Sequence, residues 1–143
     1  MATIAAIDVG SNAIRLSIAN TNADGTYETV YNVREPVRLG QDVFTKGTIS
    51  ATTVARTVQA FKNFREQLDQ HSVKRIRAVA TSALREARNR DTLVNAVKES
   101  TGIEISVIGG EEEARLIHLA VREKINLKNK LALLVDIGGG SVE

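Results

Sequence analysis

Two segments of the chain share a pattern that is suited to binding phosphate. In each, a short apolar run ends in Asp-x-Gly and is followed by small polar residues or glycine, over residues 7–12 and 135–141. Glycines let the backbone turn tightly and bring N–H donors close to an anion. Asp8 and Asp136 would hold a divalent cation, or a water that bridges to the phosphate. Ordinary turns also favour aspartate, so it is the repetition that favours a ligand site.

Each segment offers further groups that donate hydrogen bonds to phosphate. The first offers Gly10, Ser11, Asn12 and, three positions on, Arg15. The second offers Gly138, Gly139, Gly140 and Ser141. Hydroxyl and amide side chains add to the backbone donors, and the guanidinium fork of arginine matches phosphate oxygens. The repeated pattern predicts an internal duplication, with two lobes that face one ligand.

Three glutamates at the start of an expected helix are candidates for acid–base chemistry. Glu111, Glu112 and Glu113 come directly after Gly110. Acidic residues in a first turn stabilise a helix through its macrodipole by about 0.3–1 kcal/mol each, which is the simpler explanation. The functional alternative is a general base at the edge of an open sheet, where α/β folds place ligands. Repulsion among adjacent carboxylates would raise the pKa of one of them toward a useful value.

A polar segment that follows another expected strand contains arginines. Arg85 is the first of three arginines in residues 85–90, and it comes shortly after the strand end at residues 80–82. This position makes Arg85 the strongest candidate for a phosphate contact. An exposed arginine that only meets solvent is the alternative. His71 and His118 lack the spacing of metal ligands, and we interpret both as structural.

Strands that alternate with helices are expected to position these residues. Apolar alternation and turn signals predict strands over residues 4–7, 13–19, 26–34, 74–81, 103–107 and 131–136. Helical spacing predicts helices after the N-cap Ser50 for about 20 residues, from Asp91 as a cap to about Ser100, and over residues 111–124. Residues 37–48 are expected to form a loop, and residues 82–90 a polar turn or short helix. This order is typical of an α/β fold with a mixed sheet.

The composition is that of a globular protein and excludes several functions. The 143 residues are 43% hydrophobic and 25% charged, which predicts one domain with a fragment of another at most. A net charge of +2 and 3% aromatic residues argue against nucleic-acid binding and against a membrane-surface binder. The chain has no cysteine, no apolar run of about 18 residues and no signal-peptide layout, so we expect a cytoplasmic location.

Four segments occur in a specific order along the chain: residues 8–16, 78–85, 110–115 and 136–141. Together they resemble the exopolyphosphatase and guanosine pentaphosphate phosphohydrolase (Ppx/GppA) family, and the resemblance covers essentially the whole chain. It implies a ribonuclease-H-like lobe of the actin-like ATPase superfamily, with a mixed five-stranded sheet in the order β-β-β-α-β-α-β-α. The first strand of a second lobe would follow.

The resemblance also implies an activity and a role for each candidate. The activity is release of terminal phosphate from inorganic polyphosphate or guanosine pentaphosphate, with Mg²⁺ as cofactor. Glu113 would be the general base for the attacking water, and Arg85 would clamp a phosphate. The metal ligands would be Asp8, Asp136 and Glu143, and the two glycine segments would bind phosphate. Ala13 stands where the family usually has serine or threonine, which removes one hydroxyl contact.

The same resemblance sets the expected domain boundary. Residues 1–126 would form the lobe, and residues 127–143 would begin a second lobe that continues beyond the chain. The chain alone is then expected to be inactive and mobile from about Lys128, and the full-length protein could form a homodimer. The open alternatives are a non-catalytic regulator that binds phosphate or guanosine tetra- or pentaphosphate, and an actin-like-fold ATPase or kinase. The Glu-Glu-Ala-Arg helix start together with Arg85 argues against the ATPase or kinase.

Overall fold

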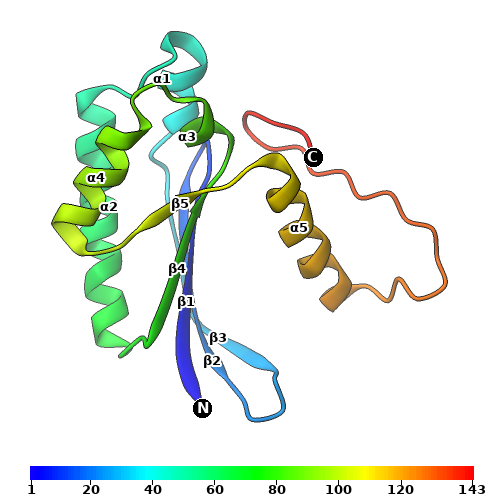
Figure 1. The fold of residues 1–143 in the computed structure, drawn as a ribbon. Helices are drawn as coiled ribbons and strands as arrows, with labels where there is room; N and C mark the ends of the chain where they lie inside the picture. The colour runs from blue at the N-terminus through cyan, green and yellow to red at the C-terminus, as the bar shows by residue number, and fades with distance from the viewer.

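A computed structural model describes residues 1–143, which form a five-stranded sheet flanked by helices (Figure 1). The strands are β1 (Ala2–Val9), β2 (Ile14–Thr21), β3 (Tyr27–Glu35), β4 (Arg75–Ala80) and β5 (Ile105–Val107). Their order across the sheet is β3-β2-β1-β4-β5. The first three form an antiparallel meander, and β4 and β5 run parallel to β1. The predicted α/β fold with a mixed five-stranded sheet is therefore confirmed.

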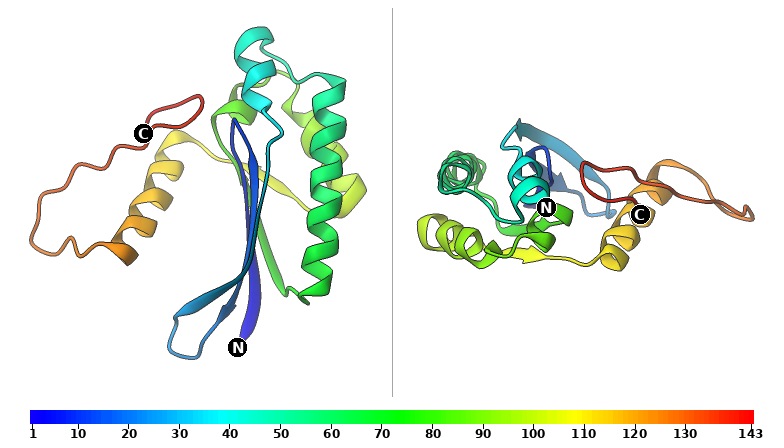
Figure 2. Two further views of the ribbon diagram at one scale, coloured as in Figure 1. Left: turned by 180° about the vertical axis from the view of Figure 1, so that it is seen from behind. Right: turned by 90° about the horizontal axis from the view of Figure 1, so that it is seen from above.

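Five helices cover the two faces of this sheet unequally. They are α1 (Leu39–Lys46), α2 (Ala51–Gln70), α3 (Ser82–Glu86), α4 (Arg90–Thr101) and α5 (Gly110–Lys124). α2 and α4 lie along one side of the sheet, α1 and α3 lie at one end of its strands, and α5 lies alone on the other side (Figure 2). α5 has no fully buried residue. No helix is both long and apolar enough to cross a bilayer.

Alternating side chains build the core on the side of α2 and α4. Ile7 on β1 and Leu16 on β2 face the helices and are almost completely buried. Phe61 and Phe64 on α2 meet them in a continuous apolar cluster. Burying a side chain of this size contributes about 1.5–3 kcal/mol. The alternate residues of each strand point to the other face of the sheet, and Asp8 is one of them.

The expected loop over residues 37–48 is wrong in part, because α1 occupies most of it. Leu39 and Val43, one turn apart, are buried and anchor this helix to the core. Gly40 gives room for the ring of Phe44. Gly47 ends the helix in the left-handed conformation, φ 72°, which suits glycine. The two glycines that suggested a loop therefore belong to a short helix, one within it and one at its C-terminal end.

Helix α2 agrees with the helix predicted after Ser50, whereas α4 begins earlier than predicted. Ser50 caps α2 by accepting a hydrogen bond from the Thr53 N–H, 3.3 Å away. The cap position before α4 is Asn89, so the prediction that Asp91 caps this helix is wrong. The Asn89 side chain instead bonds the backbone of Ile49, at 2.8 and 2.9 Å. Packing between α4 and the start of α2 therefore sets where α4 begins.

The predicted last strand, residues 131–136, is wrong because no strand lies beside it. Leu131, Leu133 and Val135 lie outside any helix or strand and are exposed, and the sole bridge in this region joins Ile137 to Val142. An apolar strand needs a neighbour to bond its backbone and cover its side chains. The predicted mobility from Lys128 stays a prediction.

Candidate active site

The first glycine loop, Gly10–Asn12, is fixed by its own turn and by α3. The Gly10 N–H donates to the Ala13 carbonyl at 3.0 Å, which closes the turn. Ser11 is only 5% exposed. Its Oγ lies 3.0 Å from the Oγ of Ser82, the first residue of α3. The Ser11 hydroxyl therefore holds the loop to the end of β4 rather than pointing to solvent as a free donor.

Helix α1 holds the same loop from the other side. The Gly40 N–H donates to the Ser11 carbonyl at 2.8 Å, and the Arg38 N–H donates to the Asn12 carbonyl at 3.0 Å. These bonds leave the Asn12 side chain exposed at the tip of the loop. The sequence did not reveal this support, since α1 was expected to be a loop.

Asp8 lies just before the first loop, on the face of the sheet away from the core. It faces Arg15 across the antiparallel pair of β1 and β2. Burial raises the pKa of Asp8, the charge of Arg15 opposes that rise, and the negative charge of Asp136 adds to it. The two Asp-x-Gly segments are therefore close enough in space for their aspartates to interact.

The second glycine loop, Gly138–Ser141, is the turn of a short hairpin. Asp136 and Glu143 exchange both backbone hydrogen bonds, at 2.9 and 3.0 Å, and Gly138 N–H donates to Ser141 O at 3.0 Å. A Cβ on Gly139 would lie 2.8 Å from Asn12 Nδ2. The two glycine loops are therefore in direct contact.

Phe44 on α1 is the second contact of this hairpin. A Cβ on Gly140 would collide with the Phe44 ring and lie 2.9 Å from Ser82 Oγ. Only a residue without a side chain fits between these groups. Phe44 was not singled out from the sequence, because an aromatic residue in an expected loop carries no signal of its own.

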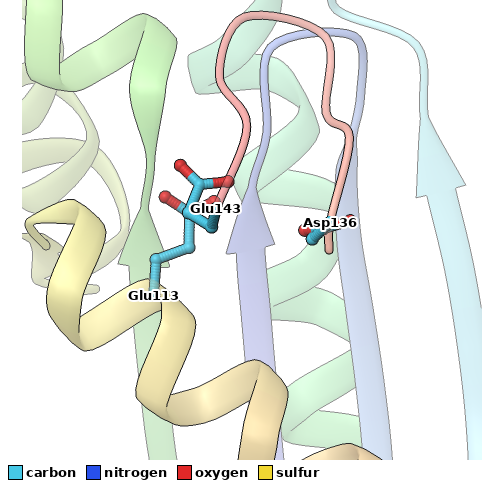
Figure 3. A group of neighbouring side chains, drawn as sticks. All are labelled: Glu113, Asp136 and Glu143. Carbon is cyan, nitrogen blue, oxygen red and sulfur yellow. The ribbon is translucent and has the colours of Figure 1, made fainter. Parts of the chain in front are cut away.

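Three carboxylates from two distant segments form a cluster (Figure 3). Glu113 projects from the first turn of α5, and Asp136 and Glu143 come from the two strands of the hairpin. One oxygen of each lies within 4.8 Å of the others. The Glu143 side chain is 7% exposed, and its Oε2 is buried without a hydrogen-bond partner. This acid cluster can hold a cation.

Arg85 on α3 ties the acid cluster to the sheet edge. Its Nη1 donates to the Ile108 carbonyl at 3.0 Å and to Glu113 Oε2 at 3.2 Å. Its Nη2 lies 3.8 Å from Glu143 Oε1. The predicted phosphate clamp and the predicted base are thus direct partners in this structure.

Burial is the main cause of the raised pKa of Glu113. The Arg85 hydrogen bond and charge lower it, while the charges of Glu143 and Asp136 raise it. Its neighbour Glu112 has a lowered pKa, because Arg115 bonds it at 2.7 Å. The expected cause, repulsion within the glutamate run, is therefore wrong: the repelling charges come from the hairpin.

The predicted site residues do not all converge on one point. Asp8, Glu113 and Asp136 line one cavity of about 290 Å³. Asp8 lies outside the acid cluster. Arg15 borders a neighbouring cavity with Asp8, at the open face of the sheet. Glu143 completes the cluster, and the two glycine loops stand beside it.

Comparison with known proteins identifies the family of this fold. A model of the Ppx/GppA phosphatase family matches residues 17–143. The structure of an exopolyphosphatase from Cytophaga hutchinsonii superposes with a TM-score of 0.93 at 36% identity, over 98% of this chain and 45% of that chain. That of the Aquifex aeolicus PPX-GPPA enzyme gives 0.89 at 33% identity, over 99% of this chain and 46% of that chain.

These matches define the class of protein to which the chain belongs. The fold is the α/β lobe that this chain shares with solved Ppx/GppA and exopolyphosphatase structures. The chain belongs to the Ppx/GppA phosphatase family. It spans less than half the length of the solved relatives.

Proposed function

We propose that this chain is the N-terminal lobe of a phosphohydrolase that releases terminal phosphate from inorganic polyphosphate or guanosine pentaphosphate. The observation that carries the proposal is the acid cluster, which stands with Arg85 beside two touching glycine loops. Phosphoryl transfer depends on positioning and on neutralising charge more than on covalent catalysis. The cluster, the arginine and the backbone donors supply those functions.

Glu113 is the residue we assign as general base. Its carboxylate borders the cavity it shares with Asp8 and Asp136, where an attacking water has room. The Arg85 contact favours the ionised form that accepts the water's proton. When a terminal phosphate enters, Arg85 is placed to turn toward its oxygens and clamp it.

Asp136 and Glu143 are the residues that would hold Mg²⁺, with Asp8 on the other side of the cavity. Carboxylate oxygens are the ligands this ion prefers. The buried, unpartnered Oε2 of Glu143 fits a cation there. Bound Mg²⁺ would supply charge neutralisation for the phosphate oxygens. The N–H groups of Gly10 and Gly138, although predicted to bind phosphate, already close their own turns. The remaining N–H groups of the two glycine loops would hold the oxygens that do not react.

We also propose that residues 1–126 form this lobe and that residues 127–143 begin a second one. Support comes from the apolar side chains of Leu131, Leu133 and Val135, which are exposed in a segment without helix or strand. Support comes too from the solved relatives, whose chains are more than twice as long as the matched part. The chain alone is then inactive, since only one wall of the cleft is built.

Glu113→Gln in the full-length protein tests this proposal. We expect phosphate release from both substrates, with Mg²⁺, to fall by at least about 100-fold, which is the scale of losing a general base. Glu111→Gln is the matched control, because Glu111 lies in the same helical turn and is exposed. Near-normal turnover in Glu113→Gln would remove Glu113 from this role. Tight binding without turnover by the unaltered protein would favour a non-catalytic regulator.

Arg85→Ala tests the clamp. We expect the KM for polyphosphate to rise, with little change in the temperature of unfolding. An unchanged KM would contradict the assignment.

A further inference from the structure

A second cavity, of about 510 Å³, lies beside the first glycine loop, and no residue of the acid cluster lines it. Asn12 and Gly139 form the wall it shares with the two loops, and Arg34 and Arg38 line it further out. No aspartate or glutamate lines it. Neither arginine forms a salt bridge. The cavity is thus strongly cationic and has no internal counter-charge.

The strand register adds a third arginine next to this cavity. Arg34 on β3 stands directly opposite Arg15 on β2, and Arg15 stands opposite Asp8 on β1. Like charges directly opposite in an antiparallel pair destabilise it. Asp8 offsets Arg15 at one end of this row, and no carboxylate offsets Arg34 at the other. A bound anion would remove the repulsion.

The backbone of Arg38 fixes its place at the cavity. Its φ of 60° and ψ of 48° lie in the left-handed region, which is uncommon for a residue with a side chain. The Arg38 N–H bond to the Asn12 carbonyl, 3.0 Å long, holds it there. Arg38 is therefore tied to the same loop that we assign to the reacting phosphate.

We propose that Arg34 and Arg38 form a subsite for the phosphates that follow the reacting one along a linear polyphosphate chain. The proposal rests on the proposed function and extends it to substrate choice. The cavity adjoins both glycine loops, so a chain whose end lies at the loops can continue into it. Two guanidinium groups suit successive phosphates, because each can bond two oxygens at once. A nucleoside polyphosphate offers the same chemistry from another source, which the experiment separates.

Arg34→Gln and Arg38→Gln in the full-length protein, singly and together, test the subsite. We measure kcat and KM with long-chain polyphosphate, tripolyphosphate and guanosine pentaphosphate. For long-chain polyphosphate we expect the KM to rise about 10-fold for each arginine, with kcat within about twofold, since a lost charge-assisted bond has this effect on affinity. The KM for tripolyphosphate and for guanosine pentaphosphate should rise by less, because at most two phosphates follow the reacting one in each triphosphate and reach only the near end of the cavity.

Arg75→Gln is the matched control. Arg75 is exposed on β4 on the same face of the sheet, four residues before the level of Asp8. Its KM values should match those of the unaltered protein. Arg34→Lys and Arg38→Lys should recover only part of the affinity, because lysine lacks the fork.

The outcomes separate the subsite from alternatives. Equal KM changes for long and short polyphosphate would overturn it, since the arginines would then act at the reacting end or on the fold. A rise confined to guanosine pentaphosphate would assign the cavity to a nucleotide instead and would also overturn it. No change with any substrate would do the same. If the protein releases no phosphate at all, the proposed function fails, and direct binding of long-chain polyphosphate then decides: weaker binding by both variants supports the subsite, and equal binding overturns it.

Discussion

Ile7 stands directly before the aspartate of the first glycine loop and is 1% exposed, whereas Val135 stands directly before that of the second and is 59% exposed. The first loop follows a central strand, with paired strands on both sides and helices on one face. The second loop is held by its own hairpin bonds and by contacts with Asn12, Phe44 and Ser82. The same sequence pattern can thus be held in place by a hydrophobic core or by a few local contacts. The surrounding elements, and not the pattern, determine which of the two applies.

The largest effect should come from a matched pair of truncations. In the 143-residue chain, Ile7→Ala should lower the free energy of unfolding by about 2–5 kcal/mol, because it leaves a cavity in the core. Val135→Ala should change it by less than about 0.5 kcal/mol, as for most exposed residues. Urea denaturation followed by circular dichroism measures both.

The same pair in the full-length protein tests the proposed second lobe. There Val135→Ala should become destabilising, since further strands would cover Val135. If Val135→Ala stays neutral in the full-length protein, residues 127–143 do not begin a packed lobe.

An intermediate effect should come from the contact between the loops. Gly140→Ala places a Cβ against the Phe44 ring and should lower phosphate release by about 10-fold, the cost of displacing groups that hold a reacting geometry. Gly138→Ala is the control, because its Cβ would lie 3.5 Å from Ser141 O, an ordinary contact. Phe44→Ala should restore part of the activity of Gly140→Ala. Equal rates in the two glycine variants would show that Phe44 does not position the second loop.

The smallest effect should come from Asp42, which fixes α1 to the start of α2. Ser50 donates two hydrogen bonds to it, at 2.6 Å from the hydroxyl and 3.0 Å from the N–H. These bonds, with one from Thr53, lower the pKa of Asp42 to about 2. Asp42→Asn should cost about 1 kcal/mol at neutral pH, the scale of a half-buried charge-assisted bond that solvent partly screens.

The pH dependence of that difference has a definite sign. A lowered pKa means that the bonds stabilise the ionised folded state, fully above the ordinary value near 3.8 and less as the pH falls toward 2. The difference in unfolding temperature between the two proteins should therefore shrink between pH 4 and pH 2. A difference that stays constant over this range would contradict the assignment.

The sequence predicted most of the fold because most elements have local signals. The long α2 follows from its apolar spacing and the Ser50 cap, and the meander follows from its turns. The short α1 was missed because Gly40 and Gly47 normally interrupt helices. Here Leu39 and Val43 bury enough apolar surface to outweigh that preference. The strand over residues 131–136 was overpredicted, since an apolar run cannot reveal whether a neighbour exists to pair with it.

For the site, the sequence indicated candidate residues but not which of them contact one another. The Asp-x-Gly repeats predicted two lobes that face one ligand, which stays a prediction, and the contact of Gly139 with Asn12 shows that the two loops lie side by side. The ion pair of Arg85 with Glu113 could not be predicted, because it joins segments 28 residues apart. Arg34 and Arg38 gave no signal, since charged residues at a strand end and in a loop are ordinary. Arg34 and Arg38 become candidates for ligand binding only because the fold places both in the lining of one cavity.

The hydrogen bonds that join Asp136 to Glu143 make these two carboxylates a preassembled pair. Their separation is set inside the hairpin, whereas the distance from either one to Glu113 depends on how the hairpin sits against α5. If the cleft opens, both move away from Glu113 together while staying in register with each other. A single displacement would then separate the proposed base, Glu113, from both proposed metal ligands at once.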